Sequence, residues 1–231
     1  MTEVLQFGSK QIEFKLKFSE RKTLGITVTP DLTVVVKAPL NTPLQIIKEK
    51  LKKRAPWIIQ QQSFFLSFQP KTPARKFVNG ETHLYLGRNY QLRIIQSAIE
   101  SVKIRGKYIE VATTKKEKVK LLMNEWYVNN AKVKFHSIAQ PLIETFKKYK
   151  IEPSSIVLRE MPTRWGSCTP KGKIILNPEL IKAPKGCIEY VIIHELCHLI
   201  HHNHTRKFID LQTKEMPDWE KWKMKLERLL A

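Results

Sequence analysis

Apolar and polar residues alternate along residues 11–37 of this chain. Apolar side chains at every second position are typical of strands that bury one face. Breaks near 19–22 and at Pro30-Asp31 divide the stretch into three predicted strands, with apolar positions at Ile12, Phe14, Leu16, Phe18, Ile26, Val28, Leu32, Val34 and Val36.

The spacing then becomes helical. From 43 to about 68 apolar residues recur every three or four positions, and Pro56 predicts a break or a second helix start. Residues 82–111 return to alternation and predict further strands, with turns at Gly87-Arg88-Asn89 and Arg105-Gly106-Lys107. Residues 1–114 therefore predict an N-terminal β-rich domain, a small mixed sheet with an embedded helix.

The second half, residues 115–231, predicts a separate domain. A long helix begins near Lys116, and Pro141 is expected to kink or restart it. Pro184 precedes another helix, at a position where proline is tolerated. The remaining predicted elements are three short strands, 156–159, 164–168 and 173–176, and a final amphipathic helix, 218–230.

Composition places the chain among soluble globular proteins. Its 231 residues are 42% hydrophobic and 27% charged, and no apolar run approaches the roughly 18 residues that a membrane span needs. The first residues lack the basic and apolar segments of a secretory signal. Three widely spaced cysteines favour reduced thiols. We therefore expect a cytoplasmic protein without a membrane partner.

The formal net charge of +20 is spread along the chain. Residues 1–114 carry 19 Lys and Arg against 8 Asp and Glu, and residues 115–231 carry 22 against 13. A field of this sign attracts polyanions such as nucleic acids, nucleotides or acidic proteins. The alternative is a lysine-rich composition that keeps the protein soluble.

His194 and His198 lie four residues apart, with Glu195 between them. On a helix both imidazoles project from one face and can bind one metal ion, while the glutamate can reach a water on that metal. This pattern is the minimal apparatus of a zinc hydrolase that binds one Zn²⁺ per chain. The alternative is a histidine pair that forms hydrogen bonds within the core.

A third ligand has two candidates. His201 has the right angular position, but it lies nearly two turns from His194, so coordination would strain the helix. His204 lies beyond the expected helix end, which Asn203 supports because asparagine tolerates the left-handed conformation. This spacing is also that of the metzincin pattern, in which a glycine stands at the position of His201. We favour His204 and expect His201 and His202 to lie behind the ligands or at the surface.

Three neighbours of the motif have competing interpretations. Glu195 is the candidate general base, which takes the proton of the attacking water. Cys197 is either a buried inert thiol, which we favour, or a fourth ligand. Tyr190 shares the ligand face and either stabilises an oxyanion or is an ordinary packed tyrosine.

These residues resemble the YgjP-like metal-dependent hydrolases, minimal zincins related to the SprT and WLM metallopeptidases. The resemblance is specific across about 159–208 and weaker earlier, and it rests on Arg164-Trp165-Gly166-Ser167-Cys168, Ile175-Leu176-Asn177, Tyr190 to Leu199, Asn203-His204-Thr205, Phe208, Lys53, Trp57-Ile58, Tyr85-Leu86-Gly87 and Tyr90. It implies zinc on His194, His198 and His204, with the base at Glu195. It also implies an α+β fold, in which the N-terminal sheet precedes a C-terminal zincin domain of helices packed on a short sheet around a central metal-binding helix. Thr205 stands where serine is common in the family, and Ile209 stands where an aromatic residue is frequent. Neither difference changes a metal ligand or the base that the resemblance implies.

The predicted strand 164–168 suggests a substrate site. Zincins usually bind an extended chain along a sheet edge beside the metal. Arg164 could hold a carboxylate or phosphate, and Trp165 could cover the cleft or stack on a base. The alternative is a structural hairpin with Trp165 in the core and Gly166 at a bulge.

Three functions remain open from the sequence. We expect a zinc metallopeptidase that acts on peptides or proteins. Some relatives carry a nucleoside-triphosphate (UTP) pyrophosphatase label, so a nucleotide substrate at the same metal site is the second possibility. The third is a DNA-associated SprT-like protease or a DNA-binding module, which the basic charge would suit.

Overall fold

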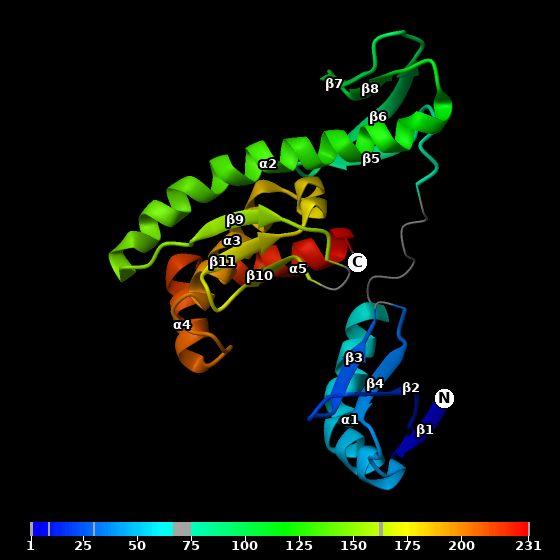
Figure 1. The fold of residues 1–231 in the computed structure, drawn as a ribbon, viewed down its shortest axis with the longest axis vertical. Coiled ribbons are helices and arrows are strands. Elements are labelled where there is room, and N and C mark those ends of the chain that lie inside the picture. The colour runs from blue at the N-terminus through cyan, green and yellow to red at the C-terminus, as the bar shows by residue number, and fades with distance from the viewer. Residues whose placement is uncertain (1, 9, 30, 67–74, 162–163, 231) are drawn as a thin grey trace. The chain divides into compact units, whose positions relative to one another are not determined.

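The computed structural model describes residues 2–8, 10–29, 31–66, 75–161 and 164–230, and its contacts divide the chain into two compact units (Figure 1). The described residues up to 66 form the first unit, and residues 75–230 form the second. The boundary expected between 114 and 115 differs from this division, because the strands of 82–112 pack with the C-terminal half. Each unit has its own hydrophobic core.

The first unit is a four-stranded mixed sheet with one helix on its inner face. Its strand order is β1-β2-β4-β3, and β2 and β4 are parallel. Alternate residues of the strands, such as Phe14 and Val34, are buried against Ile47 and Leu51 of the helix. The elements are β1 (Thr2–Phe7), β2 (Lys10–Ser19), β3 (Gly25–Val28), β4 (Val34–Pro39) and α1 (Leu44–Leu66).

The second unit begins with another four-stranded sheet, of order β5-β6-β8-β7, which packs on the long helix α2 (Val119–Phe146). Leu92 and Ile109 from the sheet share one core cluster with Met123 and Tyr127 from α2. The phenolic hydroxyl of Tyr127 donates a 2.8 Å hydrogen bond to the carbonyl of Leu84. The strands are β5 (Thr82–Tyr85), β6 (Arg88–Ile95), β7 (Ser101–Arg105) and β8 (Tyr108–Ala112).

Both internal prolines lie within continuous helices, so the break or second start expected at Pro56 and the restart expected at Pro141 are absent. Proline removes one backbone hydrogen bond and leaves the carbonyl four residues earlier without its partner. Both prolines are exposed, so water can bind that carbonyl.

A three-stranded sheet and three helices complete the second unit (Figure 1). The strand order is β10-β11-β9, so β10 is an edge strand. The hairpin turn between β10 and β11 closes at Gly172, whose φ of +74° suits glycine. The elements are β9 (Ser155–Leu158), β10 (Gly166–Cys168), β11 (Lys173–Leu176), α3 (Lys185–His198), α4 (Arg206–Glu215) and α5 (Trp219–Leu230).

The turn between β5 and β6 is joined to the segment that leads into α3. The backbone amides of Leu86 and Gly87 donate to the carbonyls of Ile181 and Lys182, at 2.8 and 3.0 Å. Gly87 has a φ of +77°, and a Cβ there would lie 2.6 Å from the ring of Pro184. Only glycine therefore permits this approach.

These elements confirm the predicted α+β class, with a small mixed sheet and helix first and a zincin-like arrangement of helices on a short sheet second. Among the described residues, no helix combines the length and apolar character that crossing a bilayer requires.

Candidate metal centre and cleft

Helix α3 begins after Pro184, as predicted, and is buried over most of its surface. Ile188, Ile192 and Leu196 are fully buried in the core. The opposite side of the helix therefore faces the cleft. The helix ends at His198, and Leu199 keeps a right-handed conformation. Asn203 is not among the residues with positive φ, so the left-handed ending expected there is wrong.

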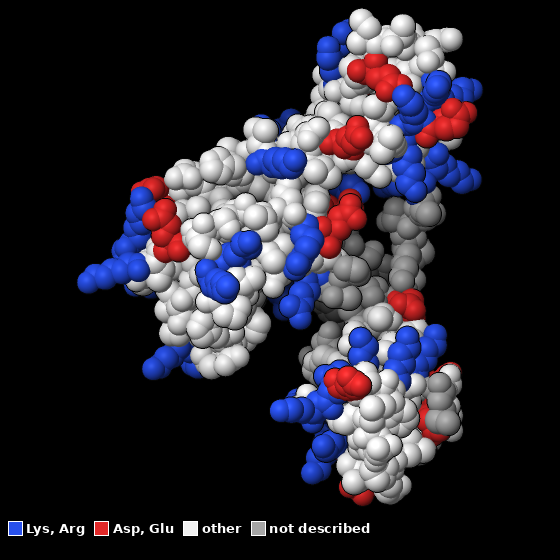
Figure 2. All heavy atoms as spheres, in the orientation of Figure 1, with Lys and Arg blue, Asp and Glu red and all other residues white. Residues whose placement is uncertain are grey.

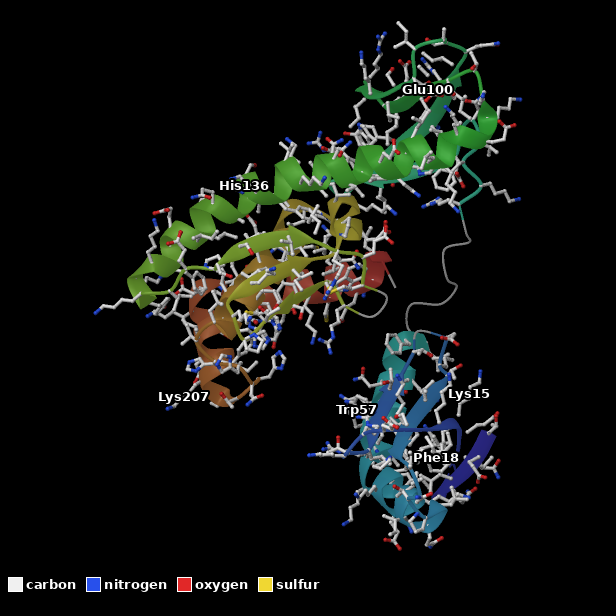
Figure 3. The ribbon with its side chains drawn as sticks, in the orientation of Figure 1. Lys15, Phe18, Trp57, Glu100, His136 and Lys207 are labelled. Atoms are coloured by element: carbon white, nitrogen blue, oxygen red, sulfur yellow. The ribbon has the colours of Figure 1, made fainter. Side chains whose placement is uncertain are left out.

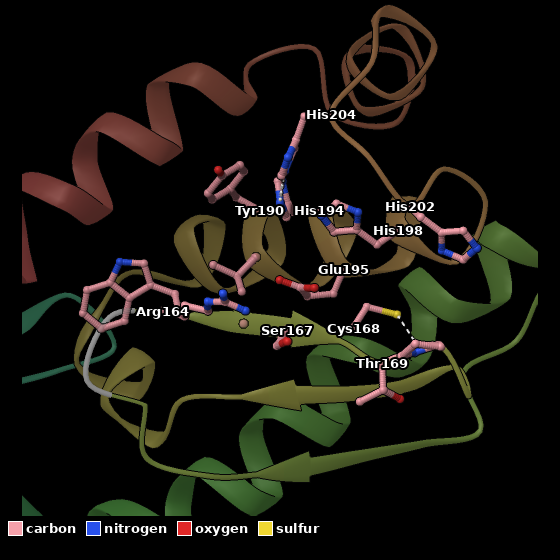
Figure 4. A pocket seen from close by; sticks show the side chains of 14 residues that line it. Arg164, Ser167, Cys168, Thr169, Tyr190, His194, Glu195, His198, His202 and His204 are labelled. Carbon is pink, nitrogen blue, oxygen red and sulfur yellow. Dashed lines mark hydrogen bonds between the residues drawn. The ribbon is translucent and has the colours of Figure 1, made fainter. Parts of the chain in front are cut away.

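The imidazoles of His194, His198 and His204 lie together, with one nitrogen of each within 4.8 Å of the others (Figure 4). The Nε2 atoms of His194 and His204 are 3.1 Å apart. Zinc–nitrogen bonds of about 2.0–2.1 Å in a tetrahedron separate two ligand nitrogens by about 3.3 Å. The three side chains therefore have the spacing that one metal ion requires.

The second ring nitrogen of two of these histidines is held by a fixed partner. Nδ1 of His194 donates to Oε1 of Gln212 at 2.8 Å, and Nδ1 of His198 donates to the carbonyl of His201 at 3.2 Å. Both bonds leave Nε2 unprotonated, which is the form that binds metal. Gln212 is almost fully buried, so its amide is held in place by packing.

Phe208 of α4 lies against all three imidazoles. Its ring centroid is 5.0, 4.6 and 4.8 Å from those of His194, His198 and His204. The Phe208 side chain is fully buried. It therefore closes the side of the histidine cluster that faces the core.

Burial favours the neutral form of His194 and His198. Desolvation lowers the pKa of His194 to about 4, against an opposing hydrogen bond from Gln212. The pKa of His198 is also lowered, first by burial. Neutral imidazole is the ligand form, so the pocket favours metal over protons at neutral pH.

Glu195 lies between the histidine cluster and strand β10 (Figure 4). The residue is 4% exposed, and burial raises its pKa to about 8, against the opposing effects of Arg164 and of a backbone hydrogen bond from Cys168. Gly166 permits this position, because a Cβ there would lie 2.5 Å from Oε1 of Glu195. The carboxyl group thus occupies a close-fitting place between helix and strand, and a divalent cation at the histidine cluster would favour its ionised form.

The backbone around β10 presents open hydrogen-bonding groups to the cleft. The backbone amide of Asn177 donates to the carbonyl of Trp165 at 2.9 Å, so the backbone polar groups of Trp165 point toward the chain that continues β11. In an antiparallel pair the next residues along, Gly166 and Cys168, direct their amides and carbonyls to the other side. That side is the open edge where Glu195 accepts the hydrogen bond from Cys168.

Arg164 and Trp165, both predicted for substrate binding, line the cleft, whose volume is about 690 Å³. Arg164 is exposed, whereas Trp165 is half-buried and packs against the core. Asn177 fixes this segment, because its side-chain amide donates to the carbonyls of Met161 and Arg164 at 2.9 and 3.1 Å. The structure thus brings both residues to the site, and their contact with substrate stays a prediction.

Tyr190 also lines the cleft and stacks on Trp219, with ring centroids 6.2 Å apart and an interplanar angle of 14°. Burial raises the pKa of its hydroxyl, so the phenol remains protonated at neutral pH. Packing accounts for the position of the ring, and a role as an oxyanion donor stays a prediction.

The remaining candidates lie outside the metal cluster among the described residues. Cys197 is fully buried, and burial raises the pKa of its thiol to about 12. His201 contributes its backbone carbonyl to His198, while its imidazole is not one of the three that converge. His202 is exposed at the rim of the cleft.

Sequence reasoning missed Gln212 and did not assign a role to Phe208. Both lie on α4, a helix that the sequence analysis did not predict. The signal available was the spacing of Phe208, Leu211 and Gln212 on one side of a polar stretch, after Thr205. Two buried residues in a ten-residue helix make that pattern weak.

One family model matches most of the chain. The family model described as YgjP-like, metallopeptidase domain, matches residues 22–229, which include every site residue described above. No curated protein matches the chain. The family match supports a metal-dependent hydrolase with a divalent metal at the histidine cluster. The chain therefore belongs to the YgjP-like family of metallopeptidase domains.

Proposed function

We propose that this protein is a zinc-dependent peptidase that cleaves an extended peptide bound along the free edge of β10. The observation that carries the proposal is the position of Glu195, whose buried carboxylate lies between three convergent imidazoles and that edge. Peptidases of the zincin type need a carboxylate that lies between the metal and the strand edge on which the substrate binds.

The donor set fits zinc. Three neutral imidazoles are among the ligand sets of catalytic zinc, which keeps a further position open for water or substrate. His194, His198 and His204 would hold the ion, with Gln212 and the His201 carbonyl orienting the first two. When bound, zinc would polarise the scissile carbonyl and acidify water.

The chain supplies the remaining steps. The open backbone groups of Gly166 would pair with a substrate strand, and the Arg164 guanidinium at the cleft would attract substrate carboxylates. Glu195 takes one proton from the water as the water oxygen attacks the carbonyl carbon of the substrate. It then gives that proton to the amine nitrogen as the carbon–nitrogen bond breaks.

Glu195→Gln tests the role of the carboxylate. Zinc-loaded protein is incubated side by side with a peptide library and with UTP, and cleavage products are measured by mass spectrometry. We expect wild-type protein to cleave peptides, and Glu195→Gln to lose at least about 10²-fold in rate with zinc content unchanged.

Glu189→Gln is the matched control. Glu189 lies on the same helix and pairs with Lys185, at 3.1 Å. The Glu189→Gln substitution makes the same chemical change away from the cleft, and this variant should keep wild-type turnover. Full peptidase activity in Glu195→Gln, or UTP cleavage without peptide cleavage, would contradict the proposal.

A further inference from the structure

The outer face of the sheet in the first unit carries a row of positive charge. Lys17 of β2 and Lys37 of β4 are direct partners in the parallel register. Their neighbours Leu16 and Val36 are buried against α1, so both lysines project from the opposite face. Like charges on adjacent strands oppose folding, which makes this placement unusual for structure alone.

Arg21 extends the row across a third strand. Gly25 of β3 pairs with Lys37, so a Cβ at Gly25 would project from the same outer face. That position is covered by the guanidinium of Arg21, whose Nη1 would lie 2.7 Å from such a Cβ. Arg21 therefore lies on the sheet next to Lys37, and the glycine provides the space.

None of these cations is neutralised among the described residues. Lys17, Lys37 and Arg21 take part in no ion pair there, and Nε of Arg21 is buried without a hydrogen-bond partner. Lys15, two residues before Lys17 on β2, adds a fourth charge on the same face (Figure 3). Glu13, two residues before Lys15, is an acidic residue on that face. Figure 2 shows Lys and Arg outnumbering Asp and Glu on the visible face of this unit.

We propose that this cationic row, Lys17, Lys37 and Arg21, binds the phosphate backbone of a nucleic acid. Adjacent strands lie about 4.8 Å apart, so three cations on three strands span about 10 Å. One nucleic-acid strand carries a phosphate about every 3.4 Å along its axis, so this span matches about three phosphates. The first unit has 11 Lys and Arg against 5 Asp and Glu in residues 2–66, which adds long-range attraction.

This proposal is independent of the peptidase site, because none of its residues lies on the metal-binding unit. Phosphate contacts carry no sequence information, so binding should be insensitive to base sequence and sensitive to salt. Binding should also persist when the metal is removed with a chelator.

The test uses the full chain with the triple substitution Lys17→Gln, Lys37→Gln and Arg21→Gln. Fluorescence anisotropy measures binding of a 20-nucleotide RNA and of a 20-base-pair DNA duplex between 50 and 200 mM salt. We expect roughly tenfold weaker binding and a salt slope reduced by about 2 to 3, since each lost phosphate contact lowers the slope by about 0.7–0.9.

The matched control removes the same charge from the same unit. Lys50→Gln, Lys52→Gln and Lys53→Gln alter three exposed lysines on α1, whose other side faces the sheet. We expect this control to keep its salt slope within about 1 of wild type. Equal losses in both triple variants would overturn the proposal, because binding would then follow net charge and not the row.

Two further results would overturn it. One is the absence of binding to either probe in wild type at 50 mM salt. The other is displacement of the RNA by poly-glutamate as readily as by unlabelled RNA of equal charge, which would assign the row to acidic proteins. Circular dichroism checks folding, and should the triple variant be unfolded, Lys37→Gln alone is expected to lower the slope by about 1.

Discussion

Gln212 holds His194 through a 2.8 Å hydrogen bond from Nδ1 to Oε1, and these residues lie on two different helices. The bond fixes which nitrogen of the imidazole can face a metal. It also joins α4 to the metal-binding helix α3. A glutamine in this place supplies the acceptor without adding a buried charge.

Gln212→Leu should therefore weaken zinc binding by about 10–100-fold, because His194 loses the partner that orients its ring. Competition with a chromogenic chelator measures the affinity. Lys207→Leu on the exposed side of α4 is the control and should leave affinity unchanged. Wild-type affinity in Gln212→Leu would show that packing alone orients the ring.

His204→Ala should reduce zinc content far below one ion per chain, whereas His201→Ala should retain it. His204 contributes a converging nitrogen, and His201 contributes only its backbone carbonyl. Metal analysis after gel filtration gives the stoichiometry. The reverse pattern would identify His201 as the third ligand.

Gly166→Ala should lower peptidase turnover by at least about 10²-fold while zinc remains bound. The new methyl group would lie 2.5 Å from Oε1 of Glu195 and 2.8 Å from Cγ1 of Val191, so the carboxylate must move. A displacement of about 1 Å costs about this much in rate. Turnover and zinc content are measured on the same sample, and an unchanged rate would show that the carboxylate position is not critical.

Asn177→Ala should lower the free energy of unfolding by about 2–4 kcal/mol, because the buried Asn177 side chain makes three hydrogen bonds to the backbone that alanine cannot make. The side chain ties together the carbonyls of Met161 and Arg164 and accepts from the amide of Glu179. Urea denaturation measures the change. A loss below about 0.5 kcal/mol would mean that water replaces these bonds.

Glu215 should make stability depend on acid pH. Burial would raise its pKa, but hydrogen bonds from Lys148 and Tyr149, at 2.7 and 2.5 Å, outweigh burial and lower it below 4.5. A folded-state pKa below the unfolded value stabilises the protein above pH 4.5, and this contribution disappears as pH falls through the folded pKa. Unfolding free energies of wild type and Glu215→Gln, measured across a series of acid pH values, should therefore differ at pH 7 and converge as the pH falls through the folded pKa of Glu215.

Local patterns in the sequence predicted most elements, because each depends on its own periodicity. Period-two alternation located β2, β3 and β4, and the spacing around His194 located α3. Strand β1 escaped detection because Glu3 occupies an inward position, where its carboxylate pairs with Lys48 of α1. That ion pair is a tertiary contact with no sequence signature.

The domain division could not be predicted for a related reason. Alternation in 82–111 indicates strands, but it does not say which helix covers them. The buried face of that sheet meets α2, and its first turn is hydrogen-bonded to Ile181 and Lys182. Ile181 and Lys182 are distant in sequence, and the closeness of α2 along the chain does not by itself show that α2 packs on the sheet. The assignment of β5–β8 to the second unit therefore depends on contacts that only the structure reveals.

Phe208 links the histidine cluster to the local stability of α4. One buried ring contacts all three imidazoles, and the segment 199–215 carries both that ring and Gln212. An ion that binds only the folded arrangement stabilises this whole corner by mass action. Protection of the α4 amides from hydrogen exchange should therefore rise when metal is added, because the ion would reinforce the contacts that Phe208 and Gln212 make with the histidines.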